Sequence, residues 1–365
     1  MSGQSFPSRR ALLAGAAGGL AAAATPGWAA AGAPRFLAAA RLPSGGYALL
    51  GLDAAGAERF RLPLPDRGHA AARHPFRAEA VAFARRPGAF ALVIDCAAGA
   101  LAAELTAPAG RHFYGHGAFT PDGALLLTTE SDYEAGDGRI GLWDAAEGYR
   151  RVGELPSGGI GPHEIVGLPG RGFAVANGGI LTHPALGRAK LNLPTMRPNL
   201  ALFSLEAGGP TRVVEPPEAL RQNSIRHLAA RADGTVAAAL QWQGAADAAP
   251  PLLALLRPGD EALTYLTAPE RQQRLANNYA GSVAFSADGA TVAITAPRGG
   301  RALAFQADSG AFAGTIAHED ICGVAPAADN GGLLFTTGTG LVVRADGTAA
   351  AGRHALAFDN HLVAI

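Results

Sequence analysis

Short apolar segments, separated by turns rich in Gly, Pro and Asp, make up nearly the whole chain after residue 33. No segment keeps the 3.6-residue apolar period of a helix that packs on a core, whereas runs of this length bounded by turn residues are typical of strands. The 49 glycines and 25 prolines agree with this reading, because both residues favour tight turns. The pattern predicts an all-β fold.

The turns themselves recur. One kind places Asp-Gly between two strands, as in Pro121-Asp122-Gly123 and Ala287-Asp288-Gly289. Another follows a strand that ends in an acidic residue, as in Trp143-Asp144. Together they mark a unit of about 40 to 60 residues with four strands, which is the period of a β-propeller blade.

Seven such units can be counted. Their first strands begin near His69, His116, His163, His227, Ser282, Gly323 and His361. The three strands expected at 35–42, 47–53 and 58–64 have no first strand of a blade before them. The C-terminal segment 360–365 has no second, third or fourth strand after it. We therefore predict a seven-bladed β-propeller over 34–365 in which the N- and C-terminal strands close one blade, leaving no exposed sheet edge. A β-sandwich, the alternative, explains neither the period nor the matching ends.

Histidine recurs at one position of this register. It stands six residues before the turn in four units and at the matching place in the last, and these five are half of the ten histidines in the chain. Equivalent positions on innermost strands form a ring, which we expect at one mouth of the central channel. The candidate metal ligands, of which a subset would bind, are His69, His116, His163, His227, His361 and Glu164. Imidazole suits Fe, Cu, Zn or the edge of a haem, and Fe and Cu are the metals considered first.

A structural role for these histidines stays open. Gly115-His116 followed by Trp143-Asp144 resembles the signature of WD repeats, in which the histidine belongs to a hydrogen-bond network. Side chains of inner strands also point toward neighbouring blades, so the imidazoles would then fill the gaps between blades.

Other polar residues are expected at the same mouth, because second strands end where first strands begin. The longest insertion, 180–198, follows one of these ends and is basic; an insertion on one face of a repeat protein is commonly a binding loop or a lid, and a loop without a binding role is the alternative. Candidate substrate- or partner-binding residues are Tyr114, Glu130, Asn177, His183, Arg188, Lys190, Arg226, Trp242 and Arg298.

The first 33 residues read as an export signal. Ser8-Arg9-Arg10-Ala11-Leu12-Leu13 resembles a twin-arginine motif and precedes a short apolar run and small residues suited to cleavage. We expect a periplasmic protein with no membrane span after cleavage. Cys96 and Cys322 fall in different blades, which predicts two free thiols rather than a disulfide.

The formal charge is zero, with 30 basic and 30 acidic residues, which argues against nucleic acid as a partner because such binding needs a basic field. The chain also lacks a haem-attachment motif, a phosphate-binding glycine loop and a nucleophile elbow. Neither composition nor motifs name a substrate.

Four stretches are distinctive: Arg111-His112-Phe113-Tyr114-Gly115-His116-Gly117, Gly161-Pro162-His163-Glu164, Ser224-Ile225-Arg226-His227 and Asp359-Asn360-His361-Leu362. With these stretches the chain resembles one bacterial family of periplasmic propellers, domain of unknown function 1513, over essentially its whole length after the signal. The resemblance implies a seven-bladed propeller related to quinoprotein amine dehydrogenase β-chains and YVTN repeats. It also implies genes beside imelysin-type iron-uptake clusters, and hence periplasmic protein partners.

Three functions are compatible with these observations. The first is a monomeric binding or accessory protein for iron or another metal, the second is a metal-dependent oxidoreductase that uses the same site, and the third is an interaction scaffold with structural histidines. The first is favoured, on the rule that function is argued from the site and not from the fold.

Overall fold

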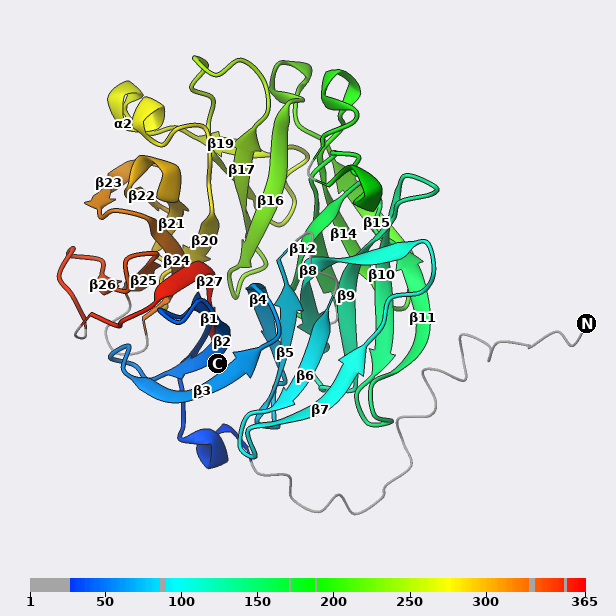
Figure 1. Ribbon diagram of the computed structural model, residues 1–365. Helices are drawn as coiled ribbons and strands as arrows, with labels where there is room; N and C mark the ends of the chain where they lie inside the picture. The colour runs from blue at the N-terminus through cyan, green and yellow to red at the C-terminus, as the bar shows by residue number, and fades with distance from the viewer. Residues whose placement is uncertain (1–26, 86–89, 171, 188, 328–331, 351–352) are drawn as a thin grey trace, which may run out of the picture.

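Seven antiparallel sheets surround a common centre (Figure 1). The computed structural model describes residues 27–85, 90–170, 172–187, 189–327, 332–350 and 353–365. The arrangement confirms the prediction of an all-β, seven-bladed β-propeller. Within the described ranges α2 (Glu270–Leu275) is the one α-helix, and none of the helices there has the length and apolar character needed to cross a membrane.

Each blade is built from consecutive strands, except that the last strand of the chain joins the first three. Blade 1 contains β27 (Ala357–Ala364), β1 (Phe36–Arg41), β2 (Tyr47–Leu52) and β3 (Glu58–Leu64), and blade 2 contains β4 (Gly68–Arg73), β5 (Glu79–Ala84), β6 (Ala91–Asp95) and β7 (Ala100–Leu105). Blade 3 contains β8 (Arg111–Phe119), β9 (Leu125–Asp132), β10 (Asp137–Asp144) and β11 (Arg150–Pro156), and blade 4 contains β12 (Pro162–Gly167), β13 (Gly172–Asn177), β14 (Asn199–Ser204) and β15 (Gly209–Val214).

The remaining three blades follow in chain order. Blade 5 contains β16 (Asn223–Ala230), β17 (Val236–Trp242), β18 (Leu253–Leu256) and β19 (Thr264–Leu266), and blade 6 contains β20 (Ser282–Phe285), β21 (Thr291–Ala296), β22 (Arg301–Gln306) and β23 (Phe312–Ala317). Blade 7 contains β24 (Ile321–Pro326), β25 (Leu333–Thr337) and β26 (Val342–Arg344).

The first blade closes the propeller as expected from the two chain ends. β27 pairs antiparallel with β1 from Phe36↔Ala364 to Arg41↔Ala357, with a bulge between Ala38 and Ala40. β27 also contacts β24 of blade 7 and β4 of blade 2, so the innermost strands form a continuous ring of neighbours. Each innermost strand therefore packs against an innermost strand on both sides.

The hydrophobic core is divided among the seven blade-to-blade interfaces. Each of seven apolar clusters joins residues of two adjacent blades; one, for example, packs Phe83 and Val93 of blade 2 against Phe113 and Trp143 of blade 3. The second strand of a blade, such as β13, is buried almost throughout, whereas an outer strand such as β7 is mostly exposed. Strands buried on both faces explain the continuous apolar runs of the sequence.

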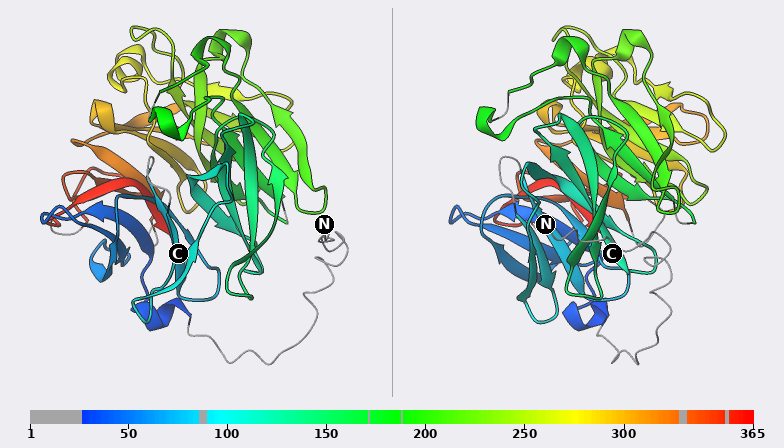
Figure 2. Two further views of the ribbon diagram at one scale, coloured as in Figure 1. Left: turned by 45° about the vertical axis from the view of Figure 1, so that its right-hand side comes forward. Right: turned by 90° about the vertical axis from the view of Figure 1, so that its right-hand side faces the viewer.

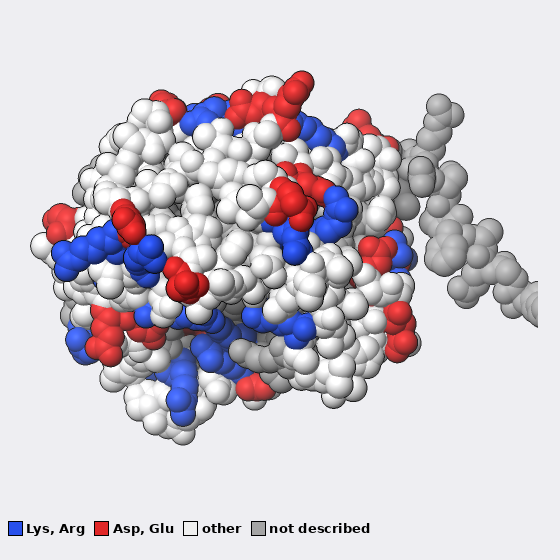
Figure 3. Space-filling model, turned by 90° about the horizontal axis from the view of Figure 1, so that it is seen from above, with Lys and Arg blue, Asp and Glu red and all other residues white. Residues whose placement is uncertain are grey.

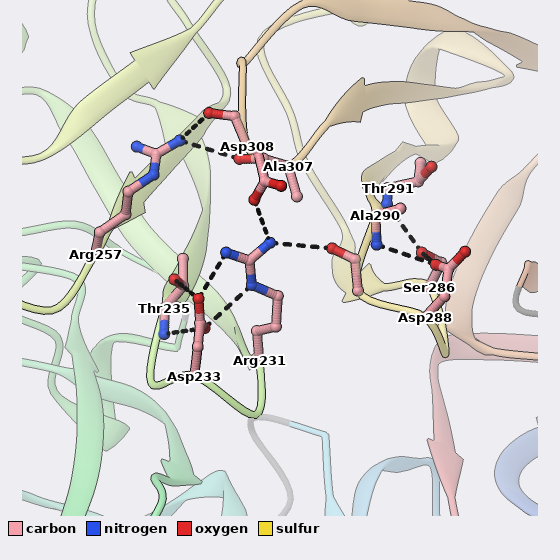
Figure 4. A network of polar contacts seen from close by, with 11 residues as sticks. Arg231, Asp233, Thr235, Arg257, Ser286, Asp288, Ala290, Thr291, Ala307 and Asp308 are labelled. Atoms are coloured by element: carbon pink, nitrogen blue, oxygen red, sulfur yellow. Dashed lines mark hydrogen bonds and ion pairs between the residues drawn. The ribbon is translucent and has the colours of Figure 1, made fainter.

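The recurring Asp-Gly turns shape the face opposite the histidines. Gly123, Gly234 and Gly289 have φ values of 70°, 92° and 72°, which glycine adopts without strain. The aspartate before each glycine accepts a backbone N–H two residues further on, as Asp288 does from Ala290 at 3.0 Å. Figure 4 shows two of these turns, where Arg231 of blade 5 also reaches Asp308 of blade 6 at 2.7 Å.

The segment that follows the export motif and the two cysteines both have defined positions in the fold. The export motif lies in residues 1–26, outside the described residues. Residues just after it pack on the propeller: Trp28 donates from Nε1 to the carbonyl oxygen of His74 at 3.0 Å, and Ala31 is buried. Cys96 and Cys322 are both free and buried, as predicted.

Candidate metal centre

Five imidazoles meet at the centre of the propeller. They come from the innermost strands of blades 2, 3, 4, 5 and 1, and in nine of their ten pairs the ring centroids lie 4.6 to 6.4 Å apart. The five are His69 of β4, His116 of β8, His163 of β12, His227 of β16 and His361 of β27. The register read from the sequence therefore brings together the residues it singled out.

The cluster lies inside the channel and not at an open mouth. His69, His116, His227 and His361 are 7%, 3%, 2% and 6% exposed, and only His163 is partly exposed. The expectation of a ring lining the mouth is thus corrected. The inner strands converge so closely that the rings pack edge to face and fill the channel, as between His163 and His227, whose planes are 90° apart.

Two glycines make this convergence possible. Gly115 has a φ of 98°, and a Cβ there would lie 2.8 Å from Cδ2 of His69. Gly323 occupies the histidine position in blade 7, where a Cβ would lie 2.4 Å from Oγ1 of Thr336 and 3.0 Å from the backbone nitrogen of Leu362. A side chain at Gly323 would push β27, and with it His361, away from the centre.

Glu164 binds two of the histidines through their Nδ1 atoms. Its Oε2 accepts from His227 Nδ1 and from the backbone N–H of Leu228, each at 3.1 Å, and its Oε1 lies 3.6 Å from His116 Nδ1. Burial by itself would raise the pKa of this carboxyl, but the charge and hydrogen bonds of His116 and His227 outweigh burial and hold the pKa well below its usual value. Glu164, expected as a possible ligand, therefore stands where an outer carboxylate orients metal-binding histidines.

Asp359 has the same relation to His69. One of its oxygens lies 3.6 Å from His69 Nδ1, and it accepts from Arg67 at 2.6 Å and from Arg85 at 2.5 Å. Burial would raise the pKa of Asp359, yet the hydrogen bond with His69 and the charges of Arg85 and Arg67 lower it well below its usual value. This buried charge is balanced by two guanidinium groups, whereas Glu164 faces imidazoles.

Buried ring nitrogens remain without a hydrogen-bond partner around the centre. Among the described residues they are His116 Nε2, His163 Nδ1 and His361 Nε2, whereas His69 Nδ1 faces the Asp359 carboxylate at 3.6 Å. Leaving one buried polar atom unpaired costs about 1–3 kcal/mol, so a group of them needs a physical explanation. A shared cation is the simplest one.

Two overlapping sets of three histidines have the spacing for an ion. In His69, His116 and His163, and again in His116, His227 and His361, one nitrogen from each residue lies within 4.8 Å of the others. Nitrogens bound to one ion at ~2.1 Å can be at most about 4.2 Å apart. Small side-chain rotations would therefore complete either set.

Burial favours the neutral, metal-binding form of four of the imidazoles, those of His69, His163, His227 and His361. Burial lowers the pKa of His69 to about 3, despite its hydrogen bond with Asp359. Burial also lowers the pKa values of His163 and His361 well below their usual range, with nearby cations adding to the effect. Neutral nitrogen donors together with a carboxylate behind two of them suit Fe, Cu or Zn better than Mg or Ca.

Two residues expected beside the histidines are located elsewhere. Glu130 is fully buried within blade 3, where both of its oxygens accept from Arg151 at 2.7 and 3.0 Å. Asn177 is also fully buried and bonds to Ser157 and Asn199, which ties blade 4 together. The alternation along a strand could not reveal that these side chains point into the sheet interfaces, so their expected place at the mouth is corrected.

The insertion 180–198 lies over one face of blades 3 to 5 and extends beyond the strand ends (Figure 2). Thr182 bonds to the hydroxyl of buried Tyr114 at 3.1 Å, and Lys190 donates to Gln243 at 2.5 Å. His183 packs edge to face on Tyr133 with centroids 5.1 Å apart. Of the expected residues, His183 and Lys190 belong to the insertion, and Tyr114 belongs to the strand on which the insertion packs. Arg188 lies outside the described residues.

The three remaining candidates, Arg226, Trp242 and Arg298, differ in how deeply they are buried. Arg226 is 9% exposed, donates to Gln241 at 3.4 Å, and its charge contributes to lowering the pKa values of His163 and His227. Trp242 bonds to the carbonyl oxygen of Ala245, and exposed Arg298 stacks 4.1 Å above the ring of Tyr279. Of these three residues, Arg226 is the one whose charge acts on the histidines.

Sequence reasoning missed Asp359 and its two arginines, Arg67 and Arg85. A signal was present, because Asp359 precedes His361 by two residues and lies in one of the stretches that carried the family resemblance. The arginines gave no signal, since they reach Asp359 from 292 and 274 residues away.

The fold and the site together define a seven-bladed β-propeller with a buried five-histidine centre. The chain belongs to the family described as "Protein of unknown function (DUF1513)", whose model matches residues 62–365. This match confirms the resemblance to a domain of unknown function. No curated protein is detectably similar in sequence.

The propeller architecture is shared with solved structures. Hydrazine synthase from Kuenenia stuttgartiensis superimposes with a TM-score of 0.60 over 85% of this chain and 90% of that chain, at 12% sequence identity. At this identity the likeness concerns the fold alone.

Proposed function

We propose that this protein binds a transition-metal ion at the five-histidine centre and serves in the handling of iron or another such metal. The observation that carries the proposal is the group of buried, unpartnered ring nitrogens on His116, His163 and His361. Glu164, which accepts from Nδ1 of His227, and Asp359, which lies 3.6 Å from Nδ1 of His69, support it, because carboxylates behind the rings fix the orientation of metal-binding histidines. Purely structural histidines would instead direct both nitrogens at protein partners.

The electrostatic balance of the centre favours a cation. The Asp359 carboxylate is neutralised by Arg67 and Arg85, whereas Glu164 is surrounded by imidazoles and one backbone N–H. A partly buried carboxylate without an arginine or lysine partner is costly by itself. A bound divalent ion would offset that cost and take up the unpartnered nitrogens at the same time.

The setting of this activity is part of the proposal. The arginine pair Arg9-Arg10 and the apolar run after it support export to the periplasm, and the insertion 180–198 supports contact with a protein partner of a monomeric propeller. Iron is proposed on the gene neighbourhood that the family resemblance implies, and copper because neutral imidazoles bind it well.

Metal counting tests the proposal. The protein should be produced in an exporting host, purified without a histidine tag and analysed for its metals after desalting. We expect close to one equivalent of iron or copper in the wild type and a large loss in His116→Gln, since His116 belongs to both sets of three. His318→Gln is the matched control, because His318 is a partly buried histidine bonded to Gly347 outside the centre.

The opposite results would favour a scaffold. A folded wild-type protein that neither carries metal nor takes up added Fe2+, Cu2+ or Zn2+ would contradict the proposal. Equal metal retention in His116→Gln and in the control would show that the metal binds elsewhere.

A further inference from the structure

We propose that the ion sits at His116, His227 and His361 with one coordination position left open to a small exogenous ligand, which arrives through a cavity from the face of the Asp-Gly turns. This inference rests on the proposed metal binding. It goes beyond metal storage, because an ion with an exchangeable position can bind and activate a small molecule.

A cavity of about 440 Å3 adjoins this set of histidines. His361 and Glu164 belong to its wall, and Glu164 in turn bonds to His227 and lies beside His116. A volume of this size falls in the range of small-molecule sites. Of the five histidines, His361 alone lines the cavity, and it belongs to the set with His116 and His227.

The cavity begins where the ring of histidines is interrupted. Ser282 of β20 holds the histidine position in blade 6, and it lines the cavity together with the apolar side chains of Val283 and Val324. A serine hydroxyl is much shorter than an imidazole, so space remains beside His361 at this point. Gly323 in blade 7 leaves no comparable space, because β27 packs directly against it.

The outer part of the cavity has a fixed entrance. Its wall continues along Ala229, Ala230 and Arg231 of blade 5 and ends near Asp288 and Gly289 of blade 6. Arg231 is held by Asp233 at 2.6 Å and by Asp308 at 2.7 Å (Figure 4), and it also donates to the carbonyl oxygen of Gly289 at 3.2 Å. The entrance therefore lies opposite the 180–198 insertion, which covers the other face.

The chemistry at the inner end fits a small ligand with a single donor atom. Three imidazoles leave one position of a tetrahedral ion, the arrangement of metal sites that act on ligands, whereas closed structural sites use four protein donors. The wall beside the position offers the hydroxyl of Ser282, the apolar side chains of Val283 and Leu228, and the carboxylate of Glu164. A small neutral molecule or monoanion meets these conditions better than a polyvalent anion.

Azide binding to the copper-loaded protein tests the open position. The Cu2+ form of the wild type should show a new azide-to-copper charge-transfer band on titration with azide. Ser282→Leu fills the inner end of the cavity and Ala230→Phe narrows it further out, so we expect each to weaken azide binding at least tenfold at unchanged copper content. Val166→Phe is the matched control, because Val166 stands three residues after His163 as Ala230 stands after His227, and it does not line the cavity.

The outcomes separate this inference from the proposed function. A wild-type protein that binds copper but not azide would overturn the open position while leaving metal binding intact, and a protein that binds no metal would overturn both. Azide binding that is equal in the wild type, Ser282→Leu and Ala230→Phe would overturn the cavity as the route. Loss of copper from both cavity variants would also contradict it, because these residues would then shape the ion site itself. Ala230 is partly exposed, so Ala230→Phe remains informative if Ser282→Leu does not fold.

Discussion

At the residue scale, two carboxylates orient imidazoles of the centre. Glu164 carries this role for His116 and His227, and Asp359 carries it for His69. Such outer partners raise the basicity of the ring and fix which nitrogen is free to bind a metal. The two carboxylates therefore matter for affinity even where they do not touch the ion.

Glu164→Gln tests this role. Glutamine keeps the shape of the side chain but removes its charge, and we expect the metal affinity to fall by about 10- to 100-fold with the fold retained. Competition with a chelator of known affinity measures the change. The control is Glu154→Gln, since Glu154 pairs with Arg111 and Arg151 away from the histidines. Equal affinities in the two variants would contradict the role assigned to Glu164.

A histidine outside the centre predicts a pH dependence of stability. His74 is 4% exposed; its Nε2 donates to the carbonyl oxygen of Gly123 at 3.2 Å, and its Nδ1 accepts from Phe76 and Arg77. Burial, with the charge of Arg77, lowers its pKa from 6.5 to about 4. As the pH falls below 6.5, His74 of the unfolded chain becomes protonated while His74 of the folded protein stays neutral. The stability that neutral, buried His74 contributes is therefore complete above pH 6.5 and is lost between pH 6.5 and about pH 4.

His74→Asn removes this titration while an amide oxygen can still accept from the same N–H groups. Urea unfolding at pH 7.5 and pH 5 should show that the wild type loses about 1–2 kcal/mol more than the variant on acidification. A loss of the same size in both proteins would show that His74 does not titrate in this way.

The positions of the histidines could be predicted from the sequence, but their burial and the contacts of several other residues could not. The histidine positions were predictable, because a turn at a constant distance fixes the register of each inner strand. The depth of the ring and the direction of Glu130 and Asn177 were not, since these depend on how closely blades pack and on which sheet face meets a neighbour. The pairing of Asp359 with Arg67 and Arg85 depends on contacts between distant parts of the chain.

At the element scale, the same strand, β27, both closes the propeller and supplies residues of the histidine centre. This strand completes blade 1, contacts blade 7 and carries His361 and Asp359. The closure was predictable from the complementary chain ends, because a propeller with one incomplete blade at each end exposes strand edges. The cavity beside β20 was not predictable, since a serine in the histidine position does not by itself reveal whether neighbouring strands close over it.

Gly323→Ala tests the close approach of β24 and β27. The added methyl group would lie 2.4 Å from Oγ1 of Thr336 and 3.0 Å from the backbone nitrogen of Leu362, so a strand must move. We expect a loss of roughly 1–3 kcal/mol in the free energy of unfolding, with weaker metal binding because His361 moves with β27. Gly167→Ala is the control, because a Cβ at Gly167 has no neighbour within 4 Å. A variant as stable as this control would contradict the tight packing.

At the scale of the whole molecule, the two faces of the propeller have different roles. The 180–198 insertion covers blades 3 to 5 on one face, and the cavity opens on the other, among the Asp-Gly turns. The surface gives little reason for a nucleic-acid partner: Figure 3 shows Lys and Arg interspersed with Asp and Glu, in keeping with a formal charge of zero. In this arrangement a protein partner would bind at the 180–198 insertion, and a small ligand would enter through the cavity on the opposite face.

The central claim is that the histidines of the channel bind one metal ion. Pulsed electron paramagnetic resonance of the protein loaded with one equivalent of Cu2+ tests it most directly, because the remote nitrogens of bound imidazoles give countable couplings. We predict the pattern of at least three imidazoles in the wild type and in His318→Gln, and a reduced count in His116→Gln or His361→Gln. A wild-type spectrum without imidazole coupling, or one left unchanged by both substitutions in the centre, would contradict the account.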